Sequence, residues 1–434
     1  MKMRAFIHAI AANLLPRSLV AALLIAPLLL APVPRLDQAA PLHPPEQAIP
    51  PDFFCLHFHH LASTTSWPAL PFGSWRTLAA YTDWPNLEPQ KGQWNFTTLD
   101  AYVGLAEKHN VSVLIPLVFT PTWASARPGE PSAYSPGNAA EPRDIEDWQN
   151  YVRVVAVRYK NRVHCYEIWN EPNLPSFFSG GPAQILRLAR EAYLILKEID
   201  PAMVVVSPSA TGGSGVSWLD NYLALGGGSY ADVVGFHFYV SPQPPEAMVD
   251  LMARVKIVMA AHHVAAKPLW NTEAGWFIEN RLTKVVPLPD SSFSKVLSSE
   301  EAVAYVARSY ILNWASGVSR FCWYSWDSEA GGLTEADGQT WKPSATAYAQ
   351  IENWLVGWRM DSCAADARGT WLCAMSRGQD RARIAWNPSH SLEMVIPEAW
   401  SATQVDRLSG GRTPLTNSTF TVGPSPVRFA SVRP

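Results

Sequence analysis

The stretch Tyr166-Glu167-Ile168-Trp169-Asn170-Glu171-Pro172-Asn173 decides how the rest of the chain is interpreted. It begins as a buried apolar strand and ends at Pro172, which has no N–H to donate to a sheet ladder. Because side chains alternate between the two faces of a strand, Glu167 and Glu171 are predicted to share one face. A break in the ladder at Pro172 would bring Asn170 and Glu171 together at the end of the strand.

Short apolar runs of this kind recur between residues 52 and 355, and segments with helical apolar periodicity separate them. Eight repeated strand–helix units predict an α/β fold, a closed (β/α)8 TIM barrel, which we place at residues 48–355. In such barrels the carboxyl ends of the strands carry the chemistry. The expected strands are 53–59, 78–84, 111–119, 163–169, 203–207, 233–239, 268–271 and 319–326, and the expected helices are 99–109, 145–159, 185–199, 245–262 and 300–315.

The pattern of apolar residues changes after residue 356, where helical periodicity stops. Short β-rich runs at 383–386, 394–396 and 420–422 are separated by turn-forming pairs that contain Pro or Gly. This pattern predicts a small C-terminal domain at 356–434, an antiparallel β-sandwich-like unit.

Residues 1–47 resemble a targeting segment followed by a Pro-rich linker. Basic residues precede the apolar run 18–31, and small residues suited to cleavage follow it. The run is short for a membrane span of about 20 residues. We therefore expect a signal peptide and a secreted or periplasmic protein without a membrane span in the mature chain; an uncleaved anchor is the alternative.

The five cysteines fit an exported protein, in which disulfides persist. Cys363 and Cys373 flank a segment short enough to be a hairpin, and we expect them to be bonded. Cys55, Cys165 and Cys322 lie inside apolar runs, and we expect them to be buried free thiols.

Composition excludes several classes of protein. With 48% hydrophobic residues, 16% charged residues and a formal net charge of −3, the chain is neither a disordered protein nor a typical nucleic-acid binder. The 19 Trp are more than a core needs, and indoles are good flat platforms for sugar rings. A Trp-rich core is the alternative for about half of these residues, and the others suit an oligo- or polysaccharide partner. The sequence leaves the oligomeric state open.

A second carboxylate, Glu273, ends a later strand in Leu269-Trp270-Asn271-Thr272-Glu273. It stands three strands after Glu171, which places the two across the mouth of an eight-stranded barrel. Glycoside hydrolysis uses two such carboxyl groups, one that protonates the leaving oxygen and one that attacks the anomeric carbon. The sequence therefore predicts a retaining mechanism, with the carboxyl groups about 5 Å apart.

Several motifs resemble clan A of the glycoside hydrolases, and most of all family 39 with its bacterial exopolysaccharide endoglycosidase relatives. The resemblance covers about residues 52–355. It departs from the family pattern at Leu78-Ala79, where relatives often have a Trp-Asp pair. The motifs are Trp84-Pro85-Asn86-Leu87-Glu88-Pro89 with Gly92-Gln93-Trp94, Thr120-Pro121-Thr122-Trp123-Ala124-Ser125, Arg158-Tyr159 with Tyr166 to Asn173, Gly235-Phe236-His237-Phe238-Tyr239, and Glu273 after a later strand.

The resemblance implies roles for individual residues. Glu171 matches the general acid/base and Glu273 the nucleophile. Asn170 matches the residue that bonds the sugar 2-hydroxyl, and Tyr239 matches the residue that orients the nucleophile. The remaining expected substrate-binding residues are His237 beside Tyr239, Arg76 near the nucleophile, Trp326 as the floor of the sugar subsite, His59 at a sugar hydroxyl, and Trp123 and Trp276 along a cleft.

No cofactor and no metal are expected, because His57, His59 and His60 alone do not supply the ligand set of a metal site. Three functions stay open. The chain is an endo-acting hydrolase of an exopolysaccharide-like glycan, an exo-acting xylosidase or uronidase, or a barrel that binds glycans without cleaving them.

Overall fold

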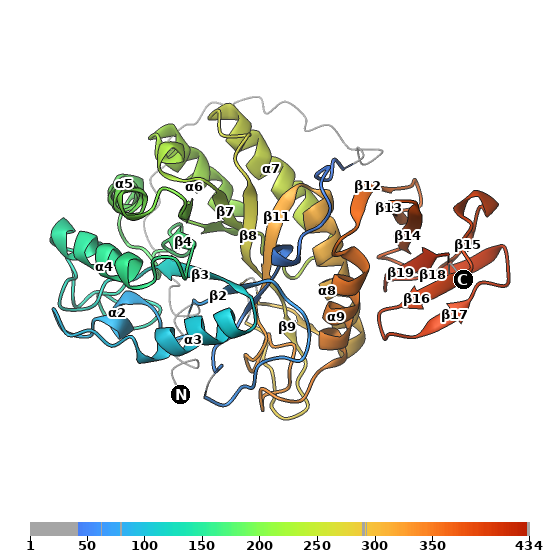
Figure 1. The fold of residues 1–434 in the computed structure, drawn as a ribbon, viewed down its shortest axis with the longest axis horizontal. Coiled ribbons are helices and arrows are strands. Elements are labelled where there is room, and N and C mark those ends of the chain that lie inside the picture. The colour runs from blue at the N-terminus through green and yellow to red at the C-terminus, as the bar shows by residue number, and fades with distance from the viewer. Residues whose placement is uncertain (1–41, 62, 79, 289–290, 292, 432–434) are drawn as a thin grey trace, which may run out of the picture.

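The computed structural model describes residues 42–61, 63–78, 80–288, 291 and 293–431 (Figure 1). Most of the predicted signal peptide and linker therefore lies outside the described residues. Within the described part, no helix combines the length and apolar character needed to cross a bilayer.

A parallel sheet that closes on itself forms the barrel. Its strand order is β5-β4-β3-β2-β1-β11-β8-β7-β6, and β5 and β6 belong to one run of chain, 204–211. Bridges from Val206 to Val233 and from Asn170 to Ser209 join this run to both neighbours, so the sheet has no free edge. The predicted TIM barrel is confirmed. Its strands are β1 (Phe54–His57), β2 (Ser74–Arg76), β3 (Ser112–Leu117), β4 (Cys165–Ile168), β5 (Val204–Val206), β6 (Ala210–Thr211), β7 (Val234–His237), β8 (Leu269–Ala274) and β11 (Val318–Trp323).

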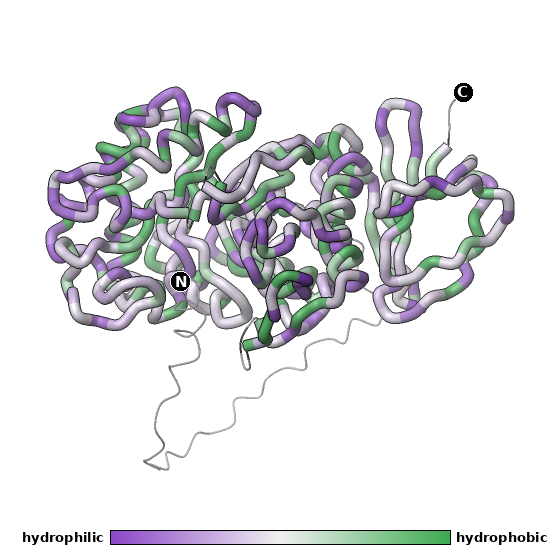
Figure 2. Tube along the Cα trace, turned by 90° about the horizontal axis from the view of Figure 1, so that it is seen from below, coloured by the Kyte–Doolittle hydropathy of each residue, from purple (hydrophilic) through white to green (hydrophobic). Residues whose placement is uncertain are grey.

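Helices cover the outer face of this sheet (Figure 1). Their starts follow known capping rules: Ser298 and Glu301 form a capping box before α8, and Pro182 occupies the first turn of α5. In Figure 2 hydrophilic segments follow the outer rim of the barrel. Most of the buried apolar side chains of the barrel form one large core, which continues into buried residues of 360–386. The helices are α2 (Trp84–Leu87), α3 (Thr97–Lys108), α4 (Ile145–Arg158), α5 (Pro182–Ile199), α6 (Gly212–Ala224), α7 (Ala247–Ala261), α8 (Ser299–Ala315) and α9 (Pro343–Leu355).

The second predicted strand was wrong. The chain forms β2 at Ser74–Arg76 and not at 78–84, and α2 begins at Trp84. β2 has three residues and only one apolar side chain, Trp75, so it lacks the apolar run by which a buried strand is recognised. The correction matters because it places Arg76 at the carboxyl end of a barrel strand.

The C-terminal domain is antiparallel, as predicted. A six-stranded sheet of order β12-β13-β14-β19-β16-β17 and the pair β15-β18 enclose a core of their own. The chain before the barrel also joins this domain, since Leu42 pairs with Cys363 and Ile49 bonds to Trp358. The strands are β12 (Arg359–Ala365), β13 (Trp371–Arg377), β14 (Asp380–Trp386), β15 (Leu392–Val395), β16 (Gln404–Arg407), β17 (Arg412–Pro414), β18 (Thr419–Val422) and β19 (Val427–Ala430).

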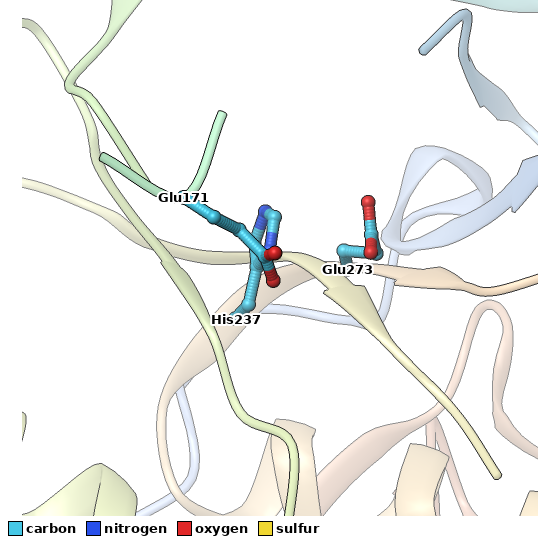
Figure 3. Close-up of side chains that lie close together, drawn as sticks. All are labelled: Glu171, His237 and Glu273. Atoms are coloured by element: carbon cyan, nitrogen blue, oxygen red, sulfur yellow. The ribbon is translucent and has the colours of Figure 1, made fainter. Parts of the chain in front are cut away.

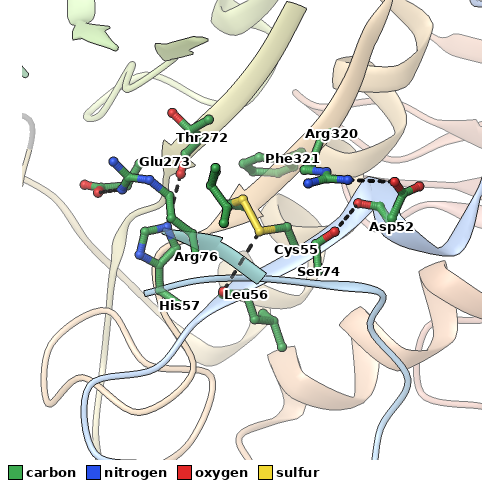
Figure 4. The surroundings of a disulfide bond; sticks show 12 residues. Asp52, Cys55, Leu56, His57, Ser74, Arg76, Thr272, Glu273, Arg320 and Phe321 are labelled. Carbon is green, nitrogen blue, oxygen red and sulfur yellow. Dashed lines mark hydrogen bonds and ion pairs between the residues drawn. A yellow bond between two sulfur atoms is a disulfide. The ribbon is translucent and has the colours of Figure 1, made fainter. Parts of the chain in front are cut away.

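Two disulfides are present among the described residues. One joins Cys363 to Cys373. The other joins Cys55 to Cys322, so these two residues are not the free thiols that we expected (Figure 4). Closure of the barrel makes β1 and β11 neighbours with these cysteines directly in register, a relationship that their local sequences do not reveal. Cys165 is a buried free thiol.

We expect the Cys55–Cys322 bond to stabilise the barrel more than the Cys363–Cys373 bond stabilises the hairpin. The first spans 267 residues and the second 10, and a longer closed loop restricts the unfolded chain more. Replacing Cys55 and Cys322 by Ala should lower the free energy of unfolding by about 3–5 kcal/mol, against about 2–3 kcal/mol for the Cys363 and Cys373 pair. Equal losses in denaturant titrations would contradict this ranking.

Candidate active site

Glu171 reaches the barrel mouth through an unusual backbone path. Trp169 and Glu171 have φ angles of 66° and 46°, a left-handed region that bulky residues seldom adopt. The ladder therefore breaks at Trp169, earlier than the break predicted at Pro172. The Trp169 indole donates to the carbonyl of Phe177 at 2.9 Å, while the Glu171 N–H donates to the carbonyl of Ser209 at 2.9 Å.

The two predicted carboxyl groups face each other in this mouth (Figure 3). One side-chain atom from each of Glu171, His237 and Glu273 can be chosen so that all three lie within 4.8 Å of one another. Carboxyl groups about 5–5.5 Å apart suit a direct attack on the sugar, whereas a separation of about 6.5–9.5 Å leaves room for a water between carboxylate and sugar. The short distance between these atoms fits the closer of the two arrangements.

Arg76 organises the site from the end of β2. Its Nε donates to Glu167 at 2.5 Å, one terminal nitrogen donates to Glu273 at 2.7 Å, and the other donates to Asn170 at 2.9 Å. The side chain is fully buried. Burial opposes its charge, but Glu167 and Glu273 outweigh that cost and raise the pKa of the guanidinium. Arg76 therefore stays charged and holds three side chains in fixed positions.

Glu167 is a functional residue whose role the sequence did not indicate. One of its oxygens receives Arg76, and the other accepts from the hydroxyls of Ser209 at 2.5 Å and Thr272 at 2.7 Å. A buried carboxylate is tolerated when every acceptor site is filled in this way. Its alternation with Glu171 was visible in the sequence, but the partners come from strands that only the fold brings near.

Glu273 is held by two donors. The Tyr239 hydroxyl donates to one oxygen at 2.9 Å, and Arg76 donates to the other. Burial raises the pKa of Glu273 and the neighbouring Glu171 adds to the rise, whereas His237, Arg76 and the Tyr239 bond oppose it. The two donors favour the ionised form of Glu273.

His237 lies elsewhere than predicted. We expected it to join Tyr239 at the nucleophile, but its Nδ1 lies 3.0 Å from Glu171. The Tyr239 phenol itself is buried beside both carboxyls, and burial followed by Glu273 holds its pKa well above the usual range. Tyr239 therefore remains a donor, and His237 contacts the carboxyl group of Glu171.

A cavity of about 980 Å³ contains both glutamates. It continues from them over the loops after β4 and β7 and along the starts of α6 and α7. The residues that line it include Glu171, Leu174, Pro175, Ser176, Phe177, Thr211, Gly212, Gly213, Tyr239, Val240, Ser241, Gln243, Ala247, Asp250, Leu251, Arg254, Glu273, Phe293 and Tyr324.

The three tryptophans predicted to form a sugar platform do not line this cavity. Trp326 is 1% exposed, and its ring packs edge-on against Trp341. Trp276 is equally buried, and Trp123 donates its indole N–H to the carbonyl of Glu88 at 2.9 Å. The aromatic residue at the end of β11 that does line the cavity is Tyr324, two positions before Trp326.

His59 also lies outside the lining. Its backbone N–H donates to Asp327 at 2.7 Å, and its ring meets Tyr324 edge to face. His57 donates from Nε2 to the Thr272 carbonyl at 3.1 Å, and burial followed by Arg76 lowers its pKa well below the usual value. In the described part of the chain these histidines form no metal-ligand cluster; the group with suitable spacing is Glu171, His237 and Glu273.

Comparison with known proteins agrees with the motifs. The model of glycosyl hydrolases family 39 matches residues 78–276. A β-xylosidase of Geobacillus stearothermophilus is 24% identical over 50% of this chain and 45% of its own length, and a β-xylosidase of Caldicellulosiruptor saccharolyticus is 28% identical over 27% and 25%. The chain thus spans half or less of the length of these relatives.

Solved structures share the fold. A family 39 glycoside hydrolase from Bacteroides cellulosilyticus has a TM-score of 0.70 at 19% identity, covering 88% of this chain and 81% of that one. A family 39 β-xylosidase from Caulobacter crescentus has a TM-score of 0.64 at 18% identity, covering 91% and 98%. The resemblance found in the sequence is confirmed, and the chain is related to family 39 of the glycoside hydrolases.

The Arg76–Glu167 pair should be a large contributor to stability. Glu167→Gln removes a buried charge opposite Arg76 and places an NH2 group among donors. We expect a loss of about 2–3 kcal/mol in the free energy of unfolding. Glu198→Gln is the control, since Glu198 and its partner Arg153 are 64% and 47% exposed, and it should cost far less stability. Equal losses in the free energy of unfolding for the two variants would show that burial of the Arg76–Glu167 pair does not add to stability.

Proposed function

We propose that this relative of the family 39 enzymes is a retaining glycoside hydrolase with Glu171 as acid/base and Glu273 as nucleophile. The observation that carries the proposal is the pair of carboxyl groups within 4.8 Å, with cationic and phenolic donors on Glu273 and a histidine on Glu171. Such unequal surroundings separate the roles of two carboxyl groups in one site.

In the first step Glu171 gives its proton to the glycosidic oxygen while an oxygen of Glu273 forms a bond to the anomeric carbon. The bond from that carbon to the leaving oxygen breaks, and a glycosyl ester remains on Glu273. Arg76 and Tyr239 fix the attacking carboxylate, so little reorganisation is needed as its charge is consumed. Asn170, itself held by Arg76, is proposed to bond the sugar 2-hydroxyl.

In the second step Glu171, now ionised, takes a proton from water as the water oxygen attacks the anomeric carbon. The ester bond breaks, Glu273 is regenerated as a carboxylate, and Glu171 is again protonated. His237, 3.0 Å from Glu171, keeps that carboxyl aimed at the water in this step and at the leaving oxygen in the first.

We further propose that the enzyme is endo-acting on an exopolysaccharide-like glycan. The leaving oxygen must lie beside Glu171, so the part of the cavity beyond Glu171 holds the leaving group. That part runs over Leu174–Phe177 and Thr211–Gly213 to the start of α7. At about 980 Å³ the cavity is at the upper end of small-ligand sites, which supports a leaving group longer than one sugar.

Exo action on β-xylosides is the second candidate, and the names of the two sequence relatives favour it. A product profile on xylan and on bacterial exopolysaccharides separates the two. Oligosaccharides of intermediate length at early times would support endo action, and a single monosaccharide from the first time point would support exo action.

We also propose that the protein is exported. Two disulfides between described cysteines support this, because such bonds persist in oxidising compartments. Immunoblots of cytoplasmic and exported fractions, probed for a processed chain, test the proposal, and a full-length chain confined to the cytoplasm would overturn it.

Substitution of either glutamate should separate binding from turnover. Glu273→Gln should remove detectable turnover, and Glu171→Gln should lower kcat by about 10²–10⁴-fold on substrates with poor leaving groups. Both variants should bind an oligosaccharide substrate, which calorimetry would measure. Binding without turnover in the wild type as well would favour the non-catalytic barrel.

Tyr239→Phe should change the pH dependence. The variant loses the phenolic donor that favours ionised Glu273, so the pKa of that carboxyl rises. Because Glu273 must be ionised to attack, the acid limb of kcat/KM should move to higher pH by about 0.5–1 unit. Tyr324→Phe, in the same cavity, is the control and should leave the limb in place. An unmoved limb in Tyr239→Phe would exclude this role.

A further inference from the structure

The C-terminal domain packs against the barrel through several buried residues, and one of them, an indole, also makes a hydrogen bond to a carboxylate of the barrel. Trp386, the last residue of β14, donates its N–H to a carboxylate oxygen of Glu246 at 2.8 Å. Arg308 of α8 donates to both oxygens of the same carboxylate at 3.2 Å. Glu246 is therefore held from two sides, by the C-terminal domain and by the barrel.

Glu246 immediately precedes α7, whose first turns form one side of the cavity. We call Ala247, Asp250, Leu251 and Arg254 the α7 wall, since all four line the cavity that contains the glutamates. The segment that leads into Glu246 begins at Tyr239, the donor to Glu273. A shift of Glu246 would consequently move the wall on the leaving-group side.

Trp386 and Arg308 are rigid anchors. Trp386 is fully buried, and its ring stacks on Trp371 of β13 with centroids 5.5 Å apart and an interplanar angle of 1°. Arg308 is 1% exposed and lies over the ring of Tyr305. Hydrogen bonds to a charged acceptor are stronger than those between neutral groups, and both anchors make such bonds.

We propose that Trp386 is a positioning residue through which the C-terminal domain fixes the α7 wall for binding of the leaving group. The expected effect on kinetics rests on the proposed function. The expected effect on the structure of the α7 wall rests on the Trp386–Glu246–Arg308 contacts. It gives the C-terminal domain a part in substrate binding without any contact between that domain and the sugar.

A second contact also holds the α7 wall, and it predicts what the loss of the Trp386 contact would do. Asn313 of α8 lies 3.4 Å from the sulfur of Met248 and also bonds Asn271 of β8. Removing Trp386 should therefore loosen the wall locally and leave the barrel and its two glutamates in place.

Hydrogen–deuterium exchange of the whole protein tests the structural part. Trp386→Phe keeps the aromatic stack and removes the N–H donor, and Trp371→Phe is the matched control within the same stack. We expect exchange to rise about three- to tenfold in peptides covering residues 244–254 in Trp386→Phe, with peptides of β3 and β4 unchanged. Glu246→Ala cuts the same contact from the barrel side and should give the same pattern.

Kinetics tests the functional part with two probes, 4-nitrophenyl β-D-xyloside and xylotetraose. In Trp386→Phe we expect KM for the tetrasaccharide to rise about three- to tenfold, with kcat on the nitrophenyl substrate within about twofold of wild type. A purely structural role would instead lower kcat on both probes alike or change neither, and either result overturns the positioning claim.

Failure of the proposed function would be recognised separately. If the wild type hydrolyses neither probe nor any glycan of a wider panel, the assigned activity fails, whereas the exchange experiment still decides the contact. Unchanged exchange at 244–254 in both Trp386→Phe and Glu246→Ala overturns the inference even if the enzyme is fully active.

Discussion

The guanidinium of Arg76 joins the ends of three barrel strands in one buried network. From β2 it bonds Glu167 and Asn170, at and just beyond the end of β4, and Glu273 on β8. An unpaired charge at this depth would cost several kcal/mol, so the network is stable only when all partners are in place. The same network therefore fixes the geometry of the site and helps to hold the barrel closed. The Cys55–Cys322 bond also holds the barrel closed beneath the site, because it joins the first barrel strand to the last (Figure 4).

The network also explains how two carboxyl groups so close together take different roles. Glu273 receives a cation and a phenol, and Glu171 receives a histidine from β7. Both donors on Glu273 favour its ionised form, and His237 lies on the Glu171 side of the site. The cavity continues on that same side, where the C-terminal domain contacts the first residues of α7. Glu171, the cavity and the contact with the C-terminal domain are consequently neighbours in the fold.

The local sequence predicted the barrel, most of its strands and the positions of both glutamates at strand ends. Long apolar runs and the carboxylates that follow them can be recognised in the sequence alone. It failed at β2, where three residues with one Trp form a barrel strand. It also failed for Cys55 with Cys322, for His237 and for Glu167, whose partners lie on strands far away in the chain. Trp326 was assigned from the resemblance to the family, but packing buries it and leaves Tyr324 at the cavity. The sequence thus predicted which residues stand at the ends of strands. It did not predict in which direction side chains beyond those ends point.

The stereochemistry of the first-formed product tests the central claim most directly. Proton NMR can follow hydrolysis of a glycan with known anomeric configuration before the free sugar equilibrates. Double displacement at Glu273 predicts that the new reducing end initially keeps the configuration of the substrate. A product that first appears with the opposite configuration would mean that water attacks directly, and the assignment of Glu273 as nucleophile would be wrong.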